Sequence, residues 1–191
     1  MHRTREHAPA IHDSGISLLP LVRVKYFPVW GTSLKGVVRT MIKNGPTDSS
    51  HEHRFAHVKW KVSWNWNRGR DHLPIFEELR LTCKITLIFP LLIKEELLTK
   101  EERGMWNRIS LALAKHEKNH ILHVLENYRD VKKRILSAWK ANRQLSGAEA
   151  NTIGQSVVSK IQKLDESYDK ETNHGMNEGL GAIIQKIPHP S

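Results

Sequence analysis

The chain has 191 residues, of which 39% are hydrophobic and six are Trp, a composition that indicates one folded domain and excludes a disordered polymer. Its single cysteine, Cys83, excludes an internal disulfide and a cysteine-based zinc site, and no apolar run approaches the roughly 20 residues that span a bilayer. The formal net charge of +10 favours anionic partners such as nucleic acid, an envelope polymer or an acidic substrate, although a solvated basic surface would have the same composition.

The first part of the chain predicts a tail, a strand and a helix. Residues 1–20 are basic and polar, without a visible export signal, and we expect them to form a mobile tail. An alternating β-branched and aromatic stretch predicts a strand over 22–30. Thr32 or Ser33 is then placed to cap a short helix that reaches Ile42 and ends at the Asn-Gly-Pro sequence that follows it.

Two further strands follow a His-rich loop. His51 and His53 lie in this loop and His57 follows soon after it, but nothing rigid in the sequence holds them at the spacing of metal ligands. Val and Trp alternate over 58–66 and predict a strand whose Trp face forms one wall of the core. The alternative is that an outer Trp lines a substrate cleft. The stretch 79–90 is more continuously apolar, which indicates a central strand.

Helical patterns fill the second half of the chain. A helix predicted over 95–103 has Thr99 three residues before Glu102, the spacing of a capping box. Gly104 is a candidate bend before a longer helix that runs to about Trp139. A pattern of that length usually breaks, at a position that the sequence does not give.

The last predicted helix, over 148–172, ends at the Asn-His-Gly sequence 173–175. These elements predict an α+β fold in which a small N-terminal sheet packs on the long helix and on the C-terminal helix. We expect a single domain over 21–181 and a C-terminal tail over 182–191.

The long helix contains the string His116-Glu117-Lys118-Asn119-His120, an H-E-x-x-H sequence. Residues four apart lie about 40° apart around a helix, so both imidazoles can reach a single zinc ion. Glu117 borders the same face, in the position of the general base that acts on water in zinc metallopeptidases. The string therefore predicts Zn²⁺ as a cofactor.

A plainer interpretation makes the two histidines part of the core. His116 and His120 continue the apolar stripe that runs from Leu113 to Val124, and a histidine on such a stripe is often simply a hydrogen-bonded core residue. Burying two imidazoles without partners would cost about a few kcal/mol. A metal would be a partner for both, so we favour the metal site.

The third zinc ligand must come from another part of the chain, because catalytic zinc usually has three protein ligands and one open position. The stretch 168–175 is the richest source of donors. We favour His174, which lies where the chain leaves helical geometry, over Asp169 and Glu166. The alternative for His174 is a surface histidine favoured by the helix dipole. His123 faces the right way, but donors on three consecutive turns of one helix would splay too far apart.

Tyr168 and Asp169 have alternative roles. Tyr168 is placed to donate to the oxyanion of a tetrahedral intermediate, or to be a core tyrosine with a satisfied hydroxyl. Asp169 is a ligand candidate, or it orients a ligand histidine from behind, as metal-bound imidazoles usually require.

The H-E-x-x-H string followed by Y-D-x-x-T-x-H-G resembles a bacterial family of predicted secreted zinc-dependent proteases, whose domain is classed as one of unknown function. The similarity covers residues from about 25 to 175. The matching features are the strand that ends at Trp30-Gly31, the Asn44-Gly45-Pro46 turn, the VKWKVSWNW strand, the strand of Cys83 that runs into Phe89-Pro90, Trp106, HEKNH and YDKETNHG.

The resemblance implies a zincin-like fold with Glu117 as the catalytic base. It also implies the remaining site residues: His116 and His120 as ligands, His174 in the third ligand position, and Tyr168, Asp169 and Thr172 around the site. The family's export suggests a secreted or periplasmic location, although no signal peptide is visible in this chain.

The sequence thus predicts a zinc-dependent metallohydrolase, a peptidase that cleaves amide bonds in a peptide or protein substrate. One alternative is a basic, non-enzymatic module that binds nucleic acid or an anionic envelope polymer, supported by the net charge and by the basic residues of 129–134. Another alternative keeps the zinc in a structural or degenerate site.

Overall fold

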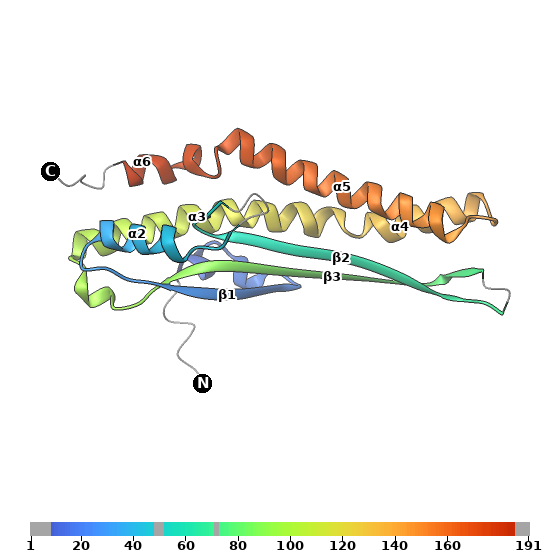
Figure 1. Cartoon of the computed structure of the whole chain (residues 1–191), viewed down its shortest axis with the longest axis horizontal. Helices are drawn as coiled ribbons and strands as arrows, with labels where there is room; N and C mark the ends of the chain where they lie inside the picture. The colour runs from blue at the N-terminus through green and yellow to red at the C-terminus, as the bar shows by residue number, and fades with distance from the viewer. Residues whose placement is uncertain (1–8, 48–51, 71–72, 186–191) are drawn as a thin grey trace.

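A three-stranded sheet forms one layer of the molecule, with the strands in the order β1-β3-β2 (Figure 1). The fold is that of a computed structural model, which describes residues 9–47, 52–70 and 73–185. β1 (Val22–Val29) is parallel to β3 (Pro74–Leu92), and β2 (His57–Arg68) is antiparallel to β3. β3 is therefore central, as its apolar sequence predicted.

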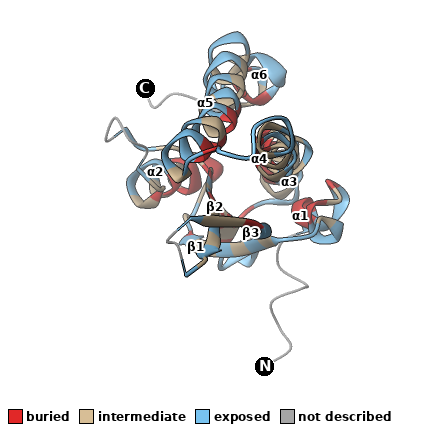
Figure 2. Ribbon diagram, turned by 90° about the vertical axis from the view of Figure 1, so that its right-hand side faces the viewer, coloured by how far each residue is buried: buried red, intermediate tan, exposed pale blue. Residues whose placement is uncertain are grey.

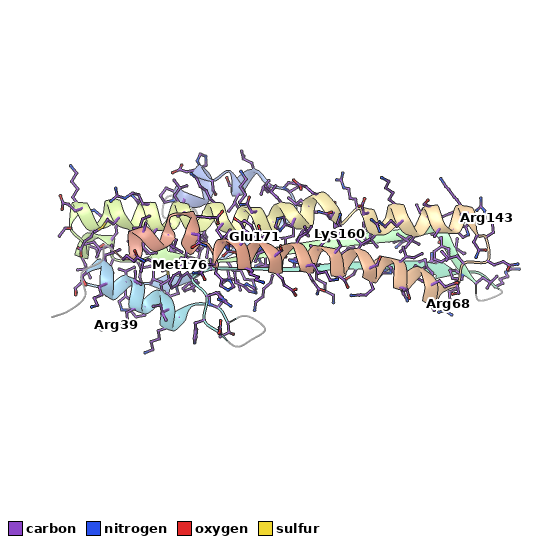
Figure 3. The ribbon with its side chains drawn as sticks, turned by 90° about the horizontal axis from the view of Figure 1, so that it is seen from above. Arg39, Arg68, Arg143, Lys160, Glu171 and Met176 are labelled. Carbon is purple, nitrogen blue, oxygen red and sulfur yellow. The ribbon has the colours of Figure 1, made fainter. Side chains whose placement is uncertain are left out.

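The long helices gather on one side of this sheet (Figures 1 and 2). α3 (Lys100–Asn127) and α4 (Asp130–Ala141) follow one another along the sheet, and α5 (Gly147–Thr172) runs back beside them. α2 (Leu34–Asn44) lies near the carboxyl end of β1. Seen from the helix side, Arg68 of the β2–β3 hairpin and Arg143 of the α4–α5 loop lie at the same end of the molecule (Figure 3). The predicted α+β arrangement of a small sheet and long helices is confirmed.

The Trp row of β2 faces these helices. Trp60, Trp64 and Trp66 pack against the core, and the indole nitrogen of Trp64 donates to Asn151 Oδ1 on α5 at 3.0 Å. Gly154, one turn further along α5, lies directly against the Trp64 ring. The absence of a side chain on Gly154 lets α5 approach β2 closely.

The predicted capping box is present, and it begins the long helix itself. The Thr99 hydroxyl accepts from Glu102 N at 3.2 Å, while the Glu102 carboxylate accepts from Thr99 N at 3.0 Å. The other oxygen of the Glu102 carboxylate accepts from Leu34 N at 2.9 Å, so the same side chain holds the first residue of α2. The prediction of an α-helix over 95–103 is wrong for the residues before Lys100. There the described chain has a 3₁₀ turn, η2 (Glu95–Leu97), in place of an α-helix.

The expected break in the long helical pattern lies at Tyr128 and Arg129, whereas Gly104 lies inside α3 and does not end it. Both break residues keep right-handed helical dihedrals. α5 begins with a second capping box, between Ser146 and Glu149, and ends close to its predicted limit.

Part of each segment expected to be a tail is ordered. The N-terminal segment forms α1 (Pro9–Asp13) and η1 (Ile16–Leu18), and it buries Ile11 and Ile16. The Lys118 ammonium of α3 donates to Ser14 O at 2.9 Å and ties this segment to the long helix.

At the other end of the described chain, η3 (Met176–Glu178) and α6 (Leu180–Ile184) continue past α5, with Leu180 buried. None of the helices in the described ranges combines the length and apolarity that a membrane crossing requires.

Candidate metal centre

The H-E-x-x-H string lies in the buried middle of α3. His116, Glu117 and His120 are 4%, 5% and 8% exposed. One helical turn separates the two histidines, and their Nε2 atoms lie 3.3 Å apart. The helix thus brings two imidazole nitrogens and one carboxyl group together in the core, as the spacing predicted.

The end of α5 adds a carboxylate to the two imidazoles. Asp169 Oδ1 lies 3.2 Å from His116 Nε2 and 3.1 Å from His120 Nε2. Ligand atoms at about 2.0–2.1 Å from a tetrahedral zinc are about 3.3–3.4 Å from one another. Three donor atoms at 3.1–3.3 Å from one another therefore have nearly the spacing of a tetrahedral nitrogen and oxygen ligand set, and these residues fit a divalent metal.

Each imidazole is held from behind by a further carboxylate. His116 Nδ1 donates to Glu178 Oε2 at 2.8 Å, and His120 Nδ1 donates to Asp165 Oδ1 at 3.1 Å. A hydrogen on Nδ1 leaves the lone pair of Nε2 available to a metal, and such partners fix the orientation of metal-bound histidines. Both Nε2 atoms consequently face the same point.

Asp165 is shared by several donors. Its Oδ1 accepts from His123 Nδ1 at 2.8 Å as well as from His120, and its Oδ2 accepts from Trp60 Nε1 at 2.9 Å. His120, His123 and Asp165 also lie close enough together to form a second possible metal group. Because both oxygens of Asp165 already accept hydrogen bonds, we interpret this residue as a support for His120.

Opposite charges hold the centre together when no metal is bound. Burial opposes a charge on His120, but hydrogen bonds to Asp165 and Asp169 outweigh burial and raise its pKa to about 10. Burial likewise opposes a charge on Asp169, but hydrogen bonds from His116 and His120 outweigh it, so the pKa of Asp169 is far below its usual range. In the metal-free protein, protons on the histidines therefore balance the negative charge of the carboxylates, which a bound cation would otherwise neutralise.

Burial raises the pKa of Glu117 to about 7, against the opposing effect of the two neighbouring histidines. Within the described part of the chain, no hydrogen bond to its carboxyl group is found. A carboxyl with a pKa near neutrality can both accept and release a proton at physiological pH, which is what general acid–base catalysis needs.

A cavity of about 310 Å³ opens beside Glu117. Its walls come from α3, from the end of α5 and from the segment that leads into β2. Of the described residues in these walls, Arg54 is the only Lys or Arg, and Phe55, Leu113 and Met176 contribute apolar surface. The cavity has room for a few atoms of a substrate next to the centre.

His174 reaches the edge of the centre. Its Nδ1 lies 3.4 Å from Asp169 Oδ1, and its side chain is 42% exposed and lines the cavity. The backbone of Asn173, His174 and Gly175 has φ values of 49°, 52° and 81°, a left-handed turn that aims the imidazole back towards Asp169. His174 does not belong to the possible metal group of His116, His120 and Asp169, so its role as third ligand stays a prediction.

Tyr168 lies behind His116, and it is not among the cavity-lining residues. The two rings stack at 4.9 Å, and the Tyr168 hydroxyl donates to Glu178 at 2.8 Å while it accepts from Asn119 Nδ2 at 2.6 Å. The oxyanion role stays a prediction that this position does not favour. Thr172 donates to Tyr168 O at 2.7 Å and accepts from Gly175 N at 3.3 Å, so it stabilises the turn at the end of α5.

The His-rich loop also meets the cavity. His53 and His57 are among its lining residues, and His53 Nδ1 donates to Gly45 O at 3.1 Å. Neither of them belongs to a possible metal group of the described chain, and His51 lies outside the described residues.

Asp165 and Glu178 are the residues that the sequence interpretation missed. A signal existed for Asp165, because Asp165 and Asp169 are four residues apart on α5 and match the spacing of His116 and His120 on α3. Glu178 lies beyond a glycine turn, and nothing local in the sequence marks it.

Comparison with known protein families gives a match over most of the chain. A family model described as a bacterial protein of unknown function (DUF922) matches residues 24–175, which include every residue of the centre except Glu178. It confirms the resemblance to a bacterial family of unknown function and shows no activity. No curated protein and no solved structure matches.

Proposed function

The chain belongs to the DUF922 family of bacterial proteins, whose function is unknown, and we propose that it is a zinc-dependent peptidase with a zincin-like active centre. The observation that carries the proposal is the approach of three donor atoms, from His116, His120 and Asp169, to within 3.3 Å of one another beside the buried carboxyl of Glu117. A structural zinc site would need neither this carboxyl nor the cavity at its side.

His116 and His120 would hold the metal, with Asp169 or His174 as the third ligand. Nitrogen and oxygen donors at tetrahedral spacing suit zinc. Zinc in a site of this kind polarises a carbonyl group and lowers the pKa of water to about 7. Glu178 and Asp165 would keep the two imidazoles aimed at the metal.

Glu117 is the proposed general base. Its carboxyl lines the cavity, and burial brings its pKa to about 7, so it would take a proton from water and release it to the departing amine. Phe55, Leu113 and Met176 would keep the substrate backbone away from bulk water.

The test is the Glu117→Gln variant in purified, zinc-loaded protein. We expect it to retain zinc by elemental analysis and to lose hydrolysis of an unstructured protein substrate by about 10²–10⁴-fold, the usual contribution of a general base. The matched variant His120→Ala is expected to lose the zinc as well. Undiminished hydrolysis by Glu117→Gln protein would remove Glu117 from the mechanism.

A further inference from the structure

The outer face of the sheet is basic over five cross-strand rows. Strand pairing places the outward residues side by side: Asn65 with Arg80, Ser63 with Thr82, Lys61 with Lys84, Lys59 with Thr86 and Arg23, and Ile88 with Lys25. Paired residues of neighbouring strands point to the same side of a sheet. We call the six cations of these rows the basic face: Arg23, Lys25, Lys59, Lys61, Arg80 and Lys84.

The basic face has no internal counter-charge. All six cations are exposed, and the five rows contain no Asp or Glu. The ion pairs found within the described chain involve other residues. Lys61 and Lys84 lie directly opposite one another, an arrangement that destabilises a sheet because like charges repel. An external anionic surface would relieve this repulsion.

Two exposed leucines lie at the edge of the basic face. Leu21 directly precedes β1 and Leu18 lies three residues before Leu21, and they are 49% and 85% exposed. The carbonyl oxygen of Leu21 accepts from Ile85 N of β3 at 3.3 Å, so Leu21 lies beside the row of Lys61 and Lys84, at the β1 edge of the basic face. The long helices lie on the opposite side of the sheet (Figure 2).

We propose that the basic face docks on an anionic phospholipid bilayer, with Leu18 and Leu21 inserted among the lipids. An array of Lys and Arg beside exposed apolar side chains is the chemistry of peripheral membrane binding. Single-stranded nucleic acid is less well matched, because the outward residues of the five rows include no Phe, Tyr or Trp on which bases could stack.

The test compares charge removal on two faces of the full chain. One variant is Lys59→Gln/Lys61→Gln/Lys84→Gln on the basic face. Its control, Lys132→Gln/Lys133→Gln/Arg134→Gln on α4, removes the same charge from the helix side of the sheet. The probes are vesicles of phosphatidylcholine with and without phosphatidylglycerol. Each basic residue near an anionic bilayer strengthens adsorption by about fivefold, so we expect the basic-face variant to bind anionic vesicles on the order of 100-fold more weakly.

Wild-type protein is expected to bind only the anionic vesicles, and less as salt increases, while the α4 variant binds almost as the wild type does. Circular dichroism checks the fold of both variants. Equal losses in the two variants, or no binding of wild type to anionic vesicles, would overturn the proposal.

A second variant, Leu18→Ser/Leu21→Ser, separates a bilayer from a soluble polyanion. We expect it to weaken vesicle binding by about tenfold and to leave binding to a single-stranded oligonucleotide unchanged. Vesicle binding that does not depend on the leucines, together with oligonucleotide binding of equal strength, would favour a nucleic-acid surface and contradict membrane docking.

Discussion

At the scale of single residues, Asp169 joins three histidines of the centre. Its Oδ1 has imidazole nitrogens of His116, His120 and His174 at 3.2, 3.1 and 3.4 Å. Either this oxygen is itself the third ligand, or it occupies the position that a metal would take among three histidines. The two arrangements differ in which substitution removes the metal.

We expect Asp169→Asn to weaken zinc binding by more than about 100-fold, because a lost ligand costs more than a lost supporting partner. Asp165→Asn is the matched control and should cost about 10–100-fold, since Asp165 contacts His120 only from behind. His174→Ala should then have the smallest effect. Competition with a chromogenic chelator measures all three, and a larger loss in His174→Ala than in Asp169→Asn would make His174 the third ligand.

Gly175 presses directly on the ring of His116. A Cβ atom at Gly175 would lie 3.0 Å from His116 Cγ, and the backbone φ of +81° is one that side chains rarely adopt. Gly179 has a similarly unfavourable φ of +99° but nothing within 4 Å of such a Cβ atom. Substitutions at the two glycines therefore distinguish the effect of backbone strain from the effect of displacing the His116 imidazole.

Gly179→Ala should lose about 1–2 kcal/mol of stability and keep its zinc affinity, because it adds only the left-handed strain. Gly175→Ala should lose the same stability or more and bind zinc at least about tenfold more weakly, because His116 must turn. Denaturant unfolding and zinc titration of both variants are the measurements. Equal zinc affinities would show that the ring does not depend on Gly175.

At the scale of elements, Gly154 sets the distance between α5 and β2. A Cβ atom there would lie 2.5 Å from the Trp64 ring, which its bond to Asn151 holds in place. We expect Gly154→Ala to destabilise the fold by about 1–3 kcal/mol through overpacking. Gly104→Ala, on the exposed side of α3 with nothing within 4 Å, should instead stabilise it by about 0.5–1 kcal/mol. Thermal unfolding compares them, and equal shifts would contradict the packing argument.

The elements show what local sequence can predict. The capping box at Thr99 and Glu102 was predictable because its hydrogen bonds join residues three apart. The break at Tyr128 and Arg129 was not, because neither Gly nor Pro marks it and both residues keep helical dihedrals. The packed N-terminal segment was missed because Ile11 and Ile16 are too few to form a pattern, and they become buried only in the folded chain, where α1 packs on α3.

In the metal centre, too, local features were predictable from the sequence and contacts between elements were not. The spacing of His116, Glu117 and His120 was visible because one helix carries all three. Their partners come from α5 and from the turn after it, so the contacts of Asp165 and Glu178 depend on how two helices pack. No periodicity within one element encodes that packing.

At the scale of the whole molecule, the charged centre links stability to pH. The pKa of His120 is about 10 in the metal-free fold and near 6.5 in an unfolded chain. Since the folded value is raised, the stabilisation is complete below about pH 6.5 and is lost as the pH rises through about 10. The raised pKa of Glu117 acts in the same direction between about pH 4.5 and 7. The metal-free protein should therefore become less stable from mildly acidic to alkaline pH.

The affinity for zinc should have the opposite pH dependence and increase as the pH rises. Binding needs neutral imidazoles, so it displaces the protons of His116 and His120 and strengthens as the pH rises. We expect the increase in Tm that equimolar zinc gives over chelator-treated protein to be larger at about pH 8.5 than at about pH 6. Calorimetry in buffers of different ionisation enthalpy should show proton release on binding. His120→Ala protein is the control and should show neither effect. A zinc-dependent increase in Tm that is the same at both pH values would mean that the metal binds away from these histidines.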